Sequence, residues 1–158
     1  MSKSKKVLII LVVAAAAVGL GIPLLRALVD LISPRPDNLG LRDGELAPCP
    51  SYPNCVSTQA EDETHAIDPI PFTGSTEAAR QRILDIVNSM ERSQMITVEP
   101  NYIYVEFRTP GLRHTDDVEF FFDEEAQLIH FRSAARLPYY DFNVNRDRME
   151  TVRSEFQE

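Results

Sequence analysis

The sequence predicts an α+β domain in which an antiparallel sheet of about four strands packs one face against two helices, preceded by one N-terminal transmembrane helix. Four segments between residues 95 and 134 alternate apolar and polar side chains, as half-buried strands do, and turn signals such as Pro100-Asn101 separate them. Two flanking segments repeat apolar side chains every three or four residues, as amphipathic helices do. An uncharged run near the N-terminus predicts the transmembrane helix.

This N-terminal run, Val7 to Leu25, contains nineteen residues without a charge. A helix of that length spans roughly 28 Å, close to the roughly 30 Å hydrocarbon core of a bilayer. Because Lys3, Lys5 and Lys6 precede it, the positive-inside rule predicts a single pass through the cytoplasmic membrane with the C-terminal domain in the periplasm. The lipid bilayer is then a partner through Val7 to Leu25. A cleaved signal peptide is the alternative, because Ala14–Ala17 offers small-residue cleavage sites.

Three parts are predicted along the chain: a membrane anchor and juxtamembrane helix over residues 1–32, a linker over 33–45, and a soluble domain over 46–158. The first 26 residues hold four of the sixteen basic residues and none of the twenty-four acidic ones. The remainder therefore has a formal net charge of −12, from twelve basic and twenty-four acidic residues. A domain this acidic is repelled by phosphate backbones, which argues against a nucleic-acid partner.

Both cysteines, Cys49 and Cys55, lie in a proline-rich stretch at the start of the predicted soluble domain. In an oxidising compartment such a pair normally forms a disulfide, and five intervening residues allow the two Cα atoms to approach within about 6 Å. The alternatives are a metal site and a catalytic cysteine, each with His65 as the nearby histidine. A metal site needs more ligands than this stretch offers, so we predict a disulfide, no metal and no cofactor.

The regular elements of the soluble domain follow from side-chain periodicity. A helix is predicted over residues 76–91, after a capping Thr73 or Ser75. A second helix is predicted to begin near Asp141 or Asn143, with an apolar stripe through Met149, Val152 and Phe156. The strands between the two helices are predicted over residues 95–99, 102–109, 116–123 and 128–134.

Several stretches carry a resemblance to a known family. The run LGLRDGELAPCPSYPNCVSTQAEDETHAIDPIPF, which begins at Leu39, resembles the opening signature of domain-of-unknown-function family 1499. Residues 116–120, 132–136 and 141–146 are similar to its later elements, so the resemblance covers about residues 39–156. The chain departs from the family pattern at Thr58 and Ala135, where the family has serine. The family occurs in bacterial envelopes and plastids, and the resemblance implies domain boundaries but no activity.

The last predicted strand, the loop after it and the final helix bring three arginines near acidic and amide side chains. Guanidinium groups are rarely buried without a carboxylate or phosphate partner. The cluster is therefore predicted either to close on the protein's own acidic residues or to bind an anionic ligand. A cation at a helix start is unfavourable unless compensated, and Asp141 is the candidate partner of Arg146. The members of the cluster are Glu106, Glu119, Arg132, Arg136, Asp141, Asn145 and Arg146.

Two classes of function fit these patterns. The first is a membrane-anchored extracytoplasmic (periplasmic) binding or envelope-assembly module, whose partner is an anionic small molecule or an envelope protein. The second is an envelope hydrolase that uses the carboxylates Glu106 and Glu119, or His130. No Gly-x-Ser-x-Gly, His-Glu-x-x-His or phosphate-binding loop is present, so the sequence leaves enzymatic activity open. A closed, fully paired cluster favours a structural role, and an open cavity favours a ligand.

Overall fold

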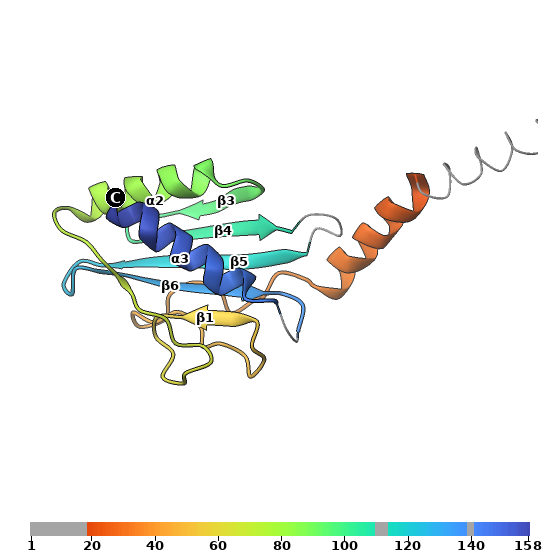
Figure 1. Ribbon diagram of the computed structural model, residues 1–158, viewed down its shortest axis with the longest axis horizontal. Coiled ribbons are helices and arrows are strands. Elements are labelled where there is room, and N and C mark those ends of the chain that lie inside the picture. Colours follow the sequence, from red (N-terminus) through yellow and green to blue (C-terminus); the bar gives the residue numbers. More distant parts are fainter. Residues whose placement is uncertain (1–18, 110–113, 139–140) are drawn as a thin grey trace, which may run out of the picture.

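The computed structural model describes residues 19–109, 114–138 and 141–158. The helices α2 (Thr76–Ser89) and α3 (Val144–Gln157) lie on one face of an antiparallel sheet (Figure 1). Its strands are β1 (Cys55–Ser57), β2 (Ile70–Pro71), β3 (Ser93–Val98), β4 (Tyr102–Arg108), β5 (Thr115–Asp123) and β6 (Leu128–Ala135). Their order is β1-β6-β5-β4-β3, and β2 also pairs with β6.

The sheet has six strands in the described chain, whereas about four were predicted. The four predicted strands correspond to β3 to β6, and the two missed strands, β1 and β2, both pair with β6. These strands are only three and two residues long, and prolines flank or enter them. Segments this short show no alternation, so side-chain periodicity could not reveal them.

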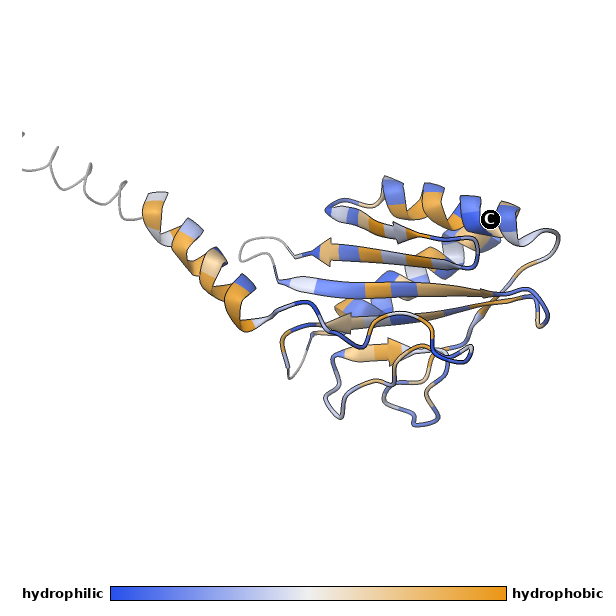
Figure 2. Cartoon of the chain, turned by 180° about the vertical axis from the view of Figure 1, so that it is seen from behind, coloured by the Kyte–Doolittle hydropathy of each residue, from blue (hydrophilic) through white to orange (hydrophobic). Residues whose placement is uncertain are grey.

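The predicted transmembrane helix is wrong for the described chain, in which no helix is long and apolar enough to cross a membrane. Residues 19–32 are helical. At 1.5 Å per residue they span about 21 Å, less than the roughly 30 Å hydrocarbon core, and they include Arg26 and Asp30. This helix is largely apolar and projects away from the sheet (Figure 2). The predicted single-pass location in the cytoplasmic membrane depended on this span and is wrong for the described chain as well. Residues 7–18 of the span lie outside the described chain, so the bilayer contact stays a prediction.

The main hydrophobic core fills the space between the sheet and the two helices. Phe120, Phe131 and Ile103 are fully buried at inward positions of three neighbouring strands, and Ile83 and Met149 meet them from the two helices. Fully burying one side chain of this size contributes about 1.5–3 kcal/mol. The sheet therefore has one apolar face, as the alternation in the sequence predicted.

Residues 33–60 cover the opposite face; we call them the covering segment. They include β1 and have no other helix or named strand. Its Leu46 packs against Tyr102 and Tyr104 of β4. The backbone N–H of Gly40 donates to Glu119 Oε1 at 2.7 Å. Residues 33–45, predicted to be a linker, thus lie against the sheet (Figure 2 views the molecule from this side). The polar face is consequently buried between β-sheet and covering segment.

The predicted disulfide between Cys49 and Cys55 is confirmed, with a Cα–Cα distance of 5.7 Å. Cys55 lies in β1 and is 2% exposed, so the bridge fastens the covering segment to the edge of the sheet.

Removing this bridge with the double substitution Cys49→Ala/Cys55→Ala is expected to lower the free energy of unfolding by roughly 2 kcal/mol, because closing a short loop removes entropy from the unfolded chain. Urea denaturation of the variant and the oxidised wild type measures the difference, with Ser51→Ala in the same loop as the control. An unchanged midpoint would show that the covering segment is held without the bridge.

Candidate functional site

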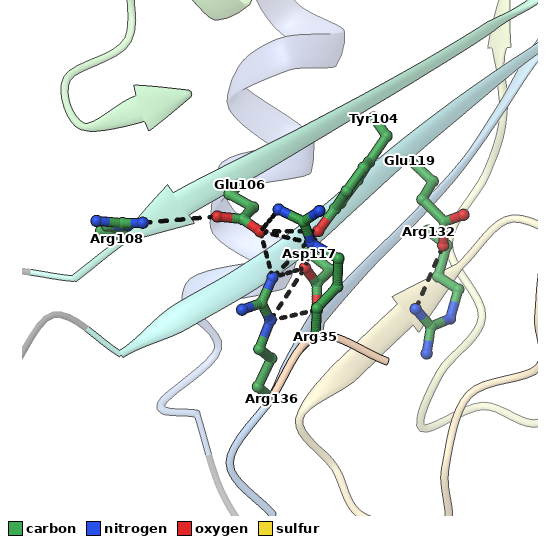
Figure 3. A network of polar contacts seen from close by, with 8 residues as sticks. All are labelled: Arg35, Tyr104, Glu106, Arg108, Asp117, Glu119, Arg132 and Arg136. Carbon is green, nitrogen blue, oxygen red and sulfur yellow. Dashed lines mark hydrogen bonds and ion pairs between the residues drawn. The ribbon is translucent and has the colours of Figure 1, made fainter. Parts of the chain in front are cut away.

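Arg136, just after β6, is the centre of the polar face (Figure 3). Its Nε donates to Asp117 Oδ2 at 3.0 Å, and its NH2 group donates to Asp117 Oδ1 at 2.7 Å and to Glu106 Oε1 at 2.5 Å. The same NH2 group donates to the Tyr104 hydroxyl at 3.1 Å. Burial alone would lower the pKa of Arg136, but hydrogen bonds to Asp117 and Glu106 outweigh it and raise the pKa. Arg136 is therefore a permanently charged group whose Nε and NH2 both donate to carboxylates.

Two further groups close this network around Glu106, which is 3% exposed. Arg35 of the covering segment donates to Glu106 Oε1 from Nε at 3.0 Å and from NH2 at 2.6 Å. The Tyr104 hydroxyl donates to Asp117 Oδ1 at 2.6 Å, and burial raises the pKa of Tyr104, so it stays a donor. Arg35, Tyr104, Glu106, Asp117 and Arg136 thus form an internal network. Two members of the predicted cluster, Glu106 and Arg136, belong to it.

The protonation of Glu106 makes the stability of the fold depend on pH. Burial would raise the pKa of Glu106, but hydrogen bonds from Arg35 and Arg136 outweigh burial and lower it. A carboxyl whose pKa is lower in the folded state stabilises the fold above its unfolded pKa of about 4.3, and this stabilisation is lost as the pH falls.

We therefore expect the free energy of unfolding of Glu106→Gln to fall less steeply than that of the wild type below about pH 4.5. Urea denaturation at a series of pH values from neutral to acidic measures both slopes. The two proteins share every other titrating group. Equal slopes of the free energy of unfolding against pH would therefore contradict the lowered pKa of Glu106.

Glu119 and Arg132 form a second, looser pair on the same face. Glu119 is completely buried, and its Oε1 accepts hydrogen bonds from the Tyr102 hydroxyl and the Gly40 N–H, each at 2.7 Å. Its Oε2 lies 3.4 Å from NH1 of Arg132. The Arg132 side chain is 6% exposed, and within the described chain its buried Nε has no hydrogen-bond partner. Unlike Arg136, Arg132 is buried with most of its hydrogen-bonding capacity unused.

A pocket of about 520 Å³ lies in the layer of the covering segment; we call it the covering pocket. Ser57, one of its lining residues, is the cross-strand partner of Arg132. Leu46, another lining residue, packs on Tyr104, which is the cross-strand partner of Glu119. Glu119 is in turn opposite Arg132, so the pocket lies beside this part of the sheet, although Arg132 itself is not among its lining residues. The lining residues are Glu45, Leu46, Ala47, Pro48, Cys49, Ser57, Gln59, Ala60, Glu61 and Asp62.

Asp141 and Asn145, two other predicted members of the cluster, lie on the helix-covered side of the sheet. Asp141 accepts hydrogen bonds from the backbone N–H groups of Asn143 and Asn145 at 3.1 and 3.0 Å, and so caps the start of α3. Asn145 is completely buried, and its Oδ1 accepts from the Ser133 hydroxyl at 2.5 Å and from Arg148 NH1 at 2.8 Å. These two residues hold α3 on the sheet and do not meet Arg132 or Arg136.

Arg146 lies apart from both groups. Its NH1 and NH2 donate to the backbone carbonyl oxygens of Ala66 and Thr64, each at 3.0 Å. The negative charge at the start of α3 is supplied by Asp141, but the structure shows no ion pair between Asp141 and Arg146 among the described residues. Arg146 therefore ties the helix to the loop before β2.

A smaller pocket of about 340 Å³ lies beside the start of α3. Among its lining residues is Asp116, which is 3% exposed and pairs through Oδ2 with Arg148 NH2 at 2.6 Å. Burial raises the pKa of Asp116, and the ion pair with Arg148 only partly offsets this effect. The described lining contains two carboxylates, Asp116 and Asp141, and no arginine or lysine.

The geometry gives little support to the hydrolase alternative. The carboxylates of Glu106 and Glu119 each accept hydrogen bonds from at least two donors. His130 Nδ1 lies 3.1 Å from the Thr58 hydroxyl, and burial lowers the pKa of His130. In the described residues, no group of three or more His, Cys, Asp or Glu side chains is arranged to hold a metal ion.

Fold and site together define a class of protein, a small α+β domain with helices on one face of an antiparallel sheet. On the other face, a segment fastened by a disulfide covers a buried network of arginines and carboxylates. Residues 45–156 match the model of the family described as "Protein of unknown function (DUF1499)", and the chain belongs to this family. The resemblance noted in the sequence is thereby confirmed. No curated protein and no solved structure matches the chain.

Proposed function

We propose that this domain binds a small molecule with a carboxylate or similar anionic group in the covering pocket, and that Arg132 is the residue that recognises this group. The observation that carries the proposal is the contrast between the two buried arginines of the polar face. Arg136 donates to two carboxylates and a tyrosine, whereas Arg132 makes one ion pair at 3.4 Å.

The energetics support a ligand for Arg132. A buried polar group without its hydrogen bonds costs about 1–3 kcal/mol, and more when it is charged. The planar guanidinium matches the geometry of a carboxylate, to which it can donate two parallel hydrogen bonds. An anionic acceptor from the pocket would supply partners that neither Glu119 nor the covering segment provides.

The shape of the site also supports binding. Small-molecule pockets commonly measure about 300–1,000 Å³ and combine apolar walls with a few polar groups. The covering pocket, at about 520 Å³, falls within this range, and its walls include Leu46 and Pro48 beside the polar Ser57 and Gln59. The Gln59 side chain is held in place by the Leu46 N–H at 2.8 Å and the Gly44 carbonyl at 3.2 Å.

The test is capture of small molecules from a lysate of the source cells by the tagged protein, followed by mass spectrometry of the released compounds. Wild type and the control Arg92→Met, an exposed arginine on another part of the chain, are expected to enrich the same anionic compounds. Arg132→Met and the pocket-filling variant Ala60→Phe are expected to lose them while keeping the wild-type circular dichroism spectrum. Equal enrichment by all four proteins, or by none, would overturn the proposal.

A further inference from the structure

Both ring nitrogens of His65, which is 8% exposed, face hydrogen-bond acceptors. Nδ1 lies 2.8 and 2.9 Å from the two carboxylate oxygens of Asp62, and Nε2 lies 3.0 Å from the backbone carbonyl oxygen of Tyr52. The contact with His65 lowers the pKa of the Asp62 carboxyl, which favours its ionised form. Neither an ionised carboxylate nor a carbonyl can donate, so both contacts are hydrogen bonds only when each ring nitrogen carries a proton. The geometry therefore favours the charged imidazolium form of His65.

The two contacts connect the two stretches of chain that line the covering pocket. The first stretch, residues 45–49, continues into the disulfide loop that carries Tyr52. The second stretch lines the pocket with residues from 57 to 62 and ends in Asp62. The Gln59 side chain also joins the two stretches, through the Leu46 N–H and the Gly44 carbonyl, but an amide does not titrate. His65 therefore adds a titratable contact between the two stretches.

The protonation of His65 depends on groups from several parts of the fold. Burial lowers the pKa of His65, and the positive charge of Arg146 on α3 lowers it further. The hydrogen bonds with the Tyr52 carbonyl and the Asp62 carboxylate outweigh both effects and raise the pKa above the ordinary value of 6.5. A group whose pKa is raised in the folded state stabilises the fold below its unfolded pKa, and this stabilisation is lost as the pH rises through the folded pKa. Both contacts of His65 are therefore made at mildly acidic pH, and one is lost at alkaline pH.

We infer that His65 is a pH-dependent clasp of the covering pocket: its imidazolium holds the two lining stretches together, and its deprotonation releases one contact between them. A neutral imidazole has one N–H, so one of its nitrogens then faces an acceptor without a proton between them. The inference rests on the proposed function and adds regulation to it. A ligand in the covering pocket is retained at mildly acidic pH and released more readily at alkaline pH.

Amide hydrogen exchange, followed by NMR on the purified, oxidised protein without ligand, tests the clasp. The Leu46 N–H reports on it, because this group donates across to Gln59 at 2.8 Å. After correction for the intrinsic pH dependence of exchange, we expect its protection to fall about tenfold between about pH 5.5 and about pH 8.5, as follows from losing one charge-assisted hydrogen bond.

Two histidine variants assign this fall to the clasp. His65→Gln keeps a hydrogen-bonding side chain that does not titrate, so the protection of the Leu46 N–H is expected to be equal at the two pH values. His114→Gln changes a histidine that does not line the covering pocket, and it should behave as the wild type does. Both variants should keep the wild-type circular dichroism spectrum. A fall in His65→Gln as large as in the wild type, or no fall in the wild type, would overturn the clasp.

NMR of the His65 ring nitrogens measures its protonation directly, and we expect both nitrogens to carry a proton at about pH 6. A neutral ring at that pH would contradict the inference. The role in binding is tested by lysate capture with the wild type at the two pH values, which should enrich more anionic compound at the lower pH. Equal enrichment would show that the clasp does not regulate binding, while the proposed function, which the Arg132→Met variant tests, would stand.

Discussion

Replacing Arg136 with methionine is expected to lower the free energy of unfolding by about 3–5 kcal/mol, the range found when one partner of a buried ion pair is removed. Arg136 neutralises both Glu106 and Asp117, which are 3% and 1% exposed. Without the guanidinium, Asp117 keeps the hydrogen bond from the Tyr104 hydroxyl at 2.6 Å. Glu106 keeps Arg35, whose side chain is half exposed, and a longer contact of 3.7 Å to Arg108, which is 36% exposed. Two buried carboxylates would then lack sufficient compensation.

Urea denaturation of Arg136→Met and of the control Arg92→Met measures this effect. Arg92 pairs with Glu91 at 2.6 Å, but their side chains are 49% and 80% exposed, so its loss should change stability by about 0.5 kcal/mol or less. A loss of stability for Arg136→Met no larger than that of the control would show that the network does not hold the covering segment on the sheet.

Replacing Asn145 with alanine is expected to lower the free energy of unfolding by about 2–4 kcal/mol, because several buried groups lose their partner at once. Its Oδ1 accepts from Ser133 and Arg148, and its Nδ2 donates to Asp141 Oδ2 at 2.8 Å and to the Asn54 carbonyl at 3.3 Å. The side chain thus joins α3, β6 and the segment before β1.

Thermal or urea unfolding of Asn145→Ala provides the measurement, and Asn88→Ala, an exposed asparagine in α2, is the matched control. The control should change the free energy of unfolding by about 0.5 kcal/mol or less. Equal effects for the two substitutions would contradict a structural role for the Asn145 hydrogen bonds.

Much of the sheet could be predicted because half-buried strands repeat with a period of two. The strand predicted over residues 116–123 corresponds to β5 (Thr115–Asp123), and the strand predicted over 128–134 corresponds to β6 (Leu128–Ala135). The same alternation placed Glu106, Glu119 and Arg132 on one face, as the structure shows. It also placed Asp117 there, so the sequence held a signal for this member of the network that the predicted cluster omitted.

Other parts of the site depend on contacts that no local pattern encodes. Arg35 meets Glu106 from 71 positions away, and the segment that carries it has no periodicity. Two members of the predicted cluster at the start of α3, Asn145 and Arg146, also point in different directions in the structure. Adjacent residues of a helix point about 100° apart. Asn145 therefore faces the sheet while Arg146 reaches the carbonyls of Thr64 and Ala66.

Arg136 stabilises the fold, whereas we propose that Arg132 binds a ligand. The most direct test is the free energy of unfolding of Arg132→Met/Glu119→Gln, measured by urea denaturation without added ligand. The double substitution removes both charges of the loose pair and keeps a hydrogen-bonding side chain for Tyr102 and Gly40. Replacing both members of a buried ion pair avoids an uncompensated buried charge, and such replacements by apolar residues are often neutral or stabilising by about 1–4 kcal/mol. Because this variant likewise leaves no buried charge unpaired, we predict stability close to or above that of the wild type. A loss of about 3–5 kcal/mol, as expected for Arg136→Met, would instead show that Arg132 serves the fold.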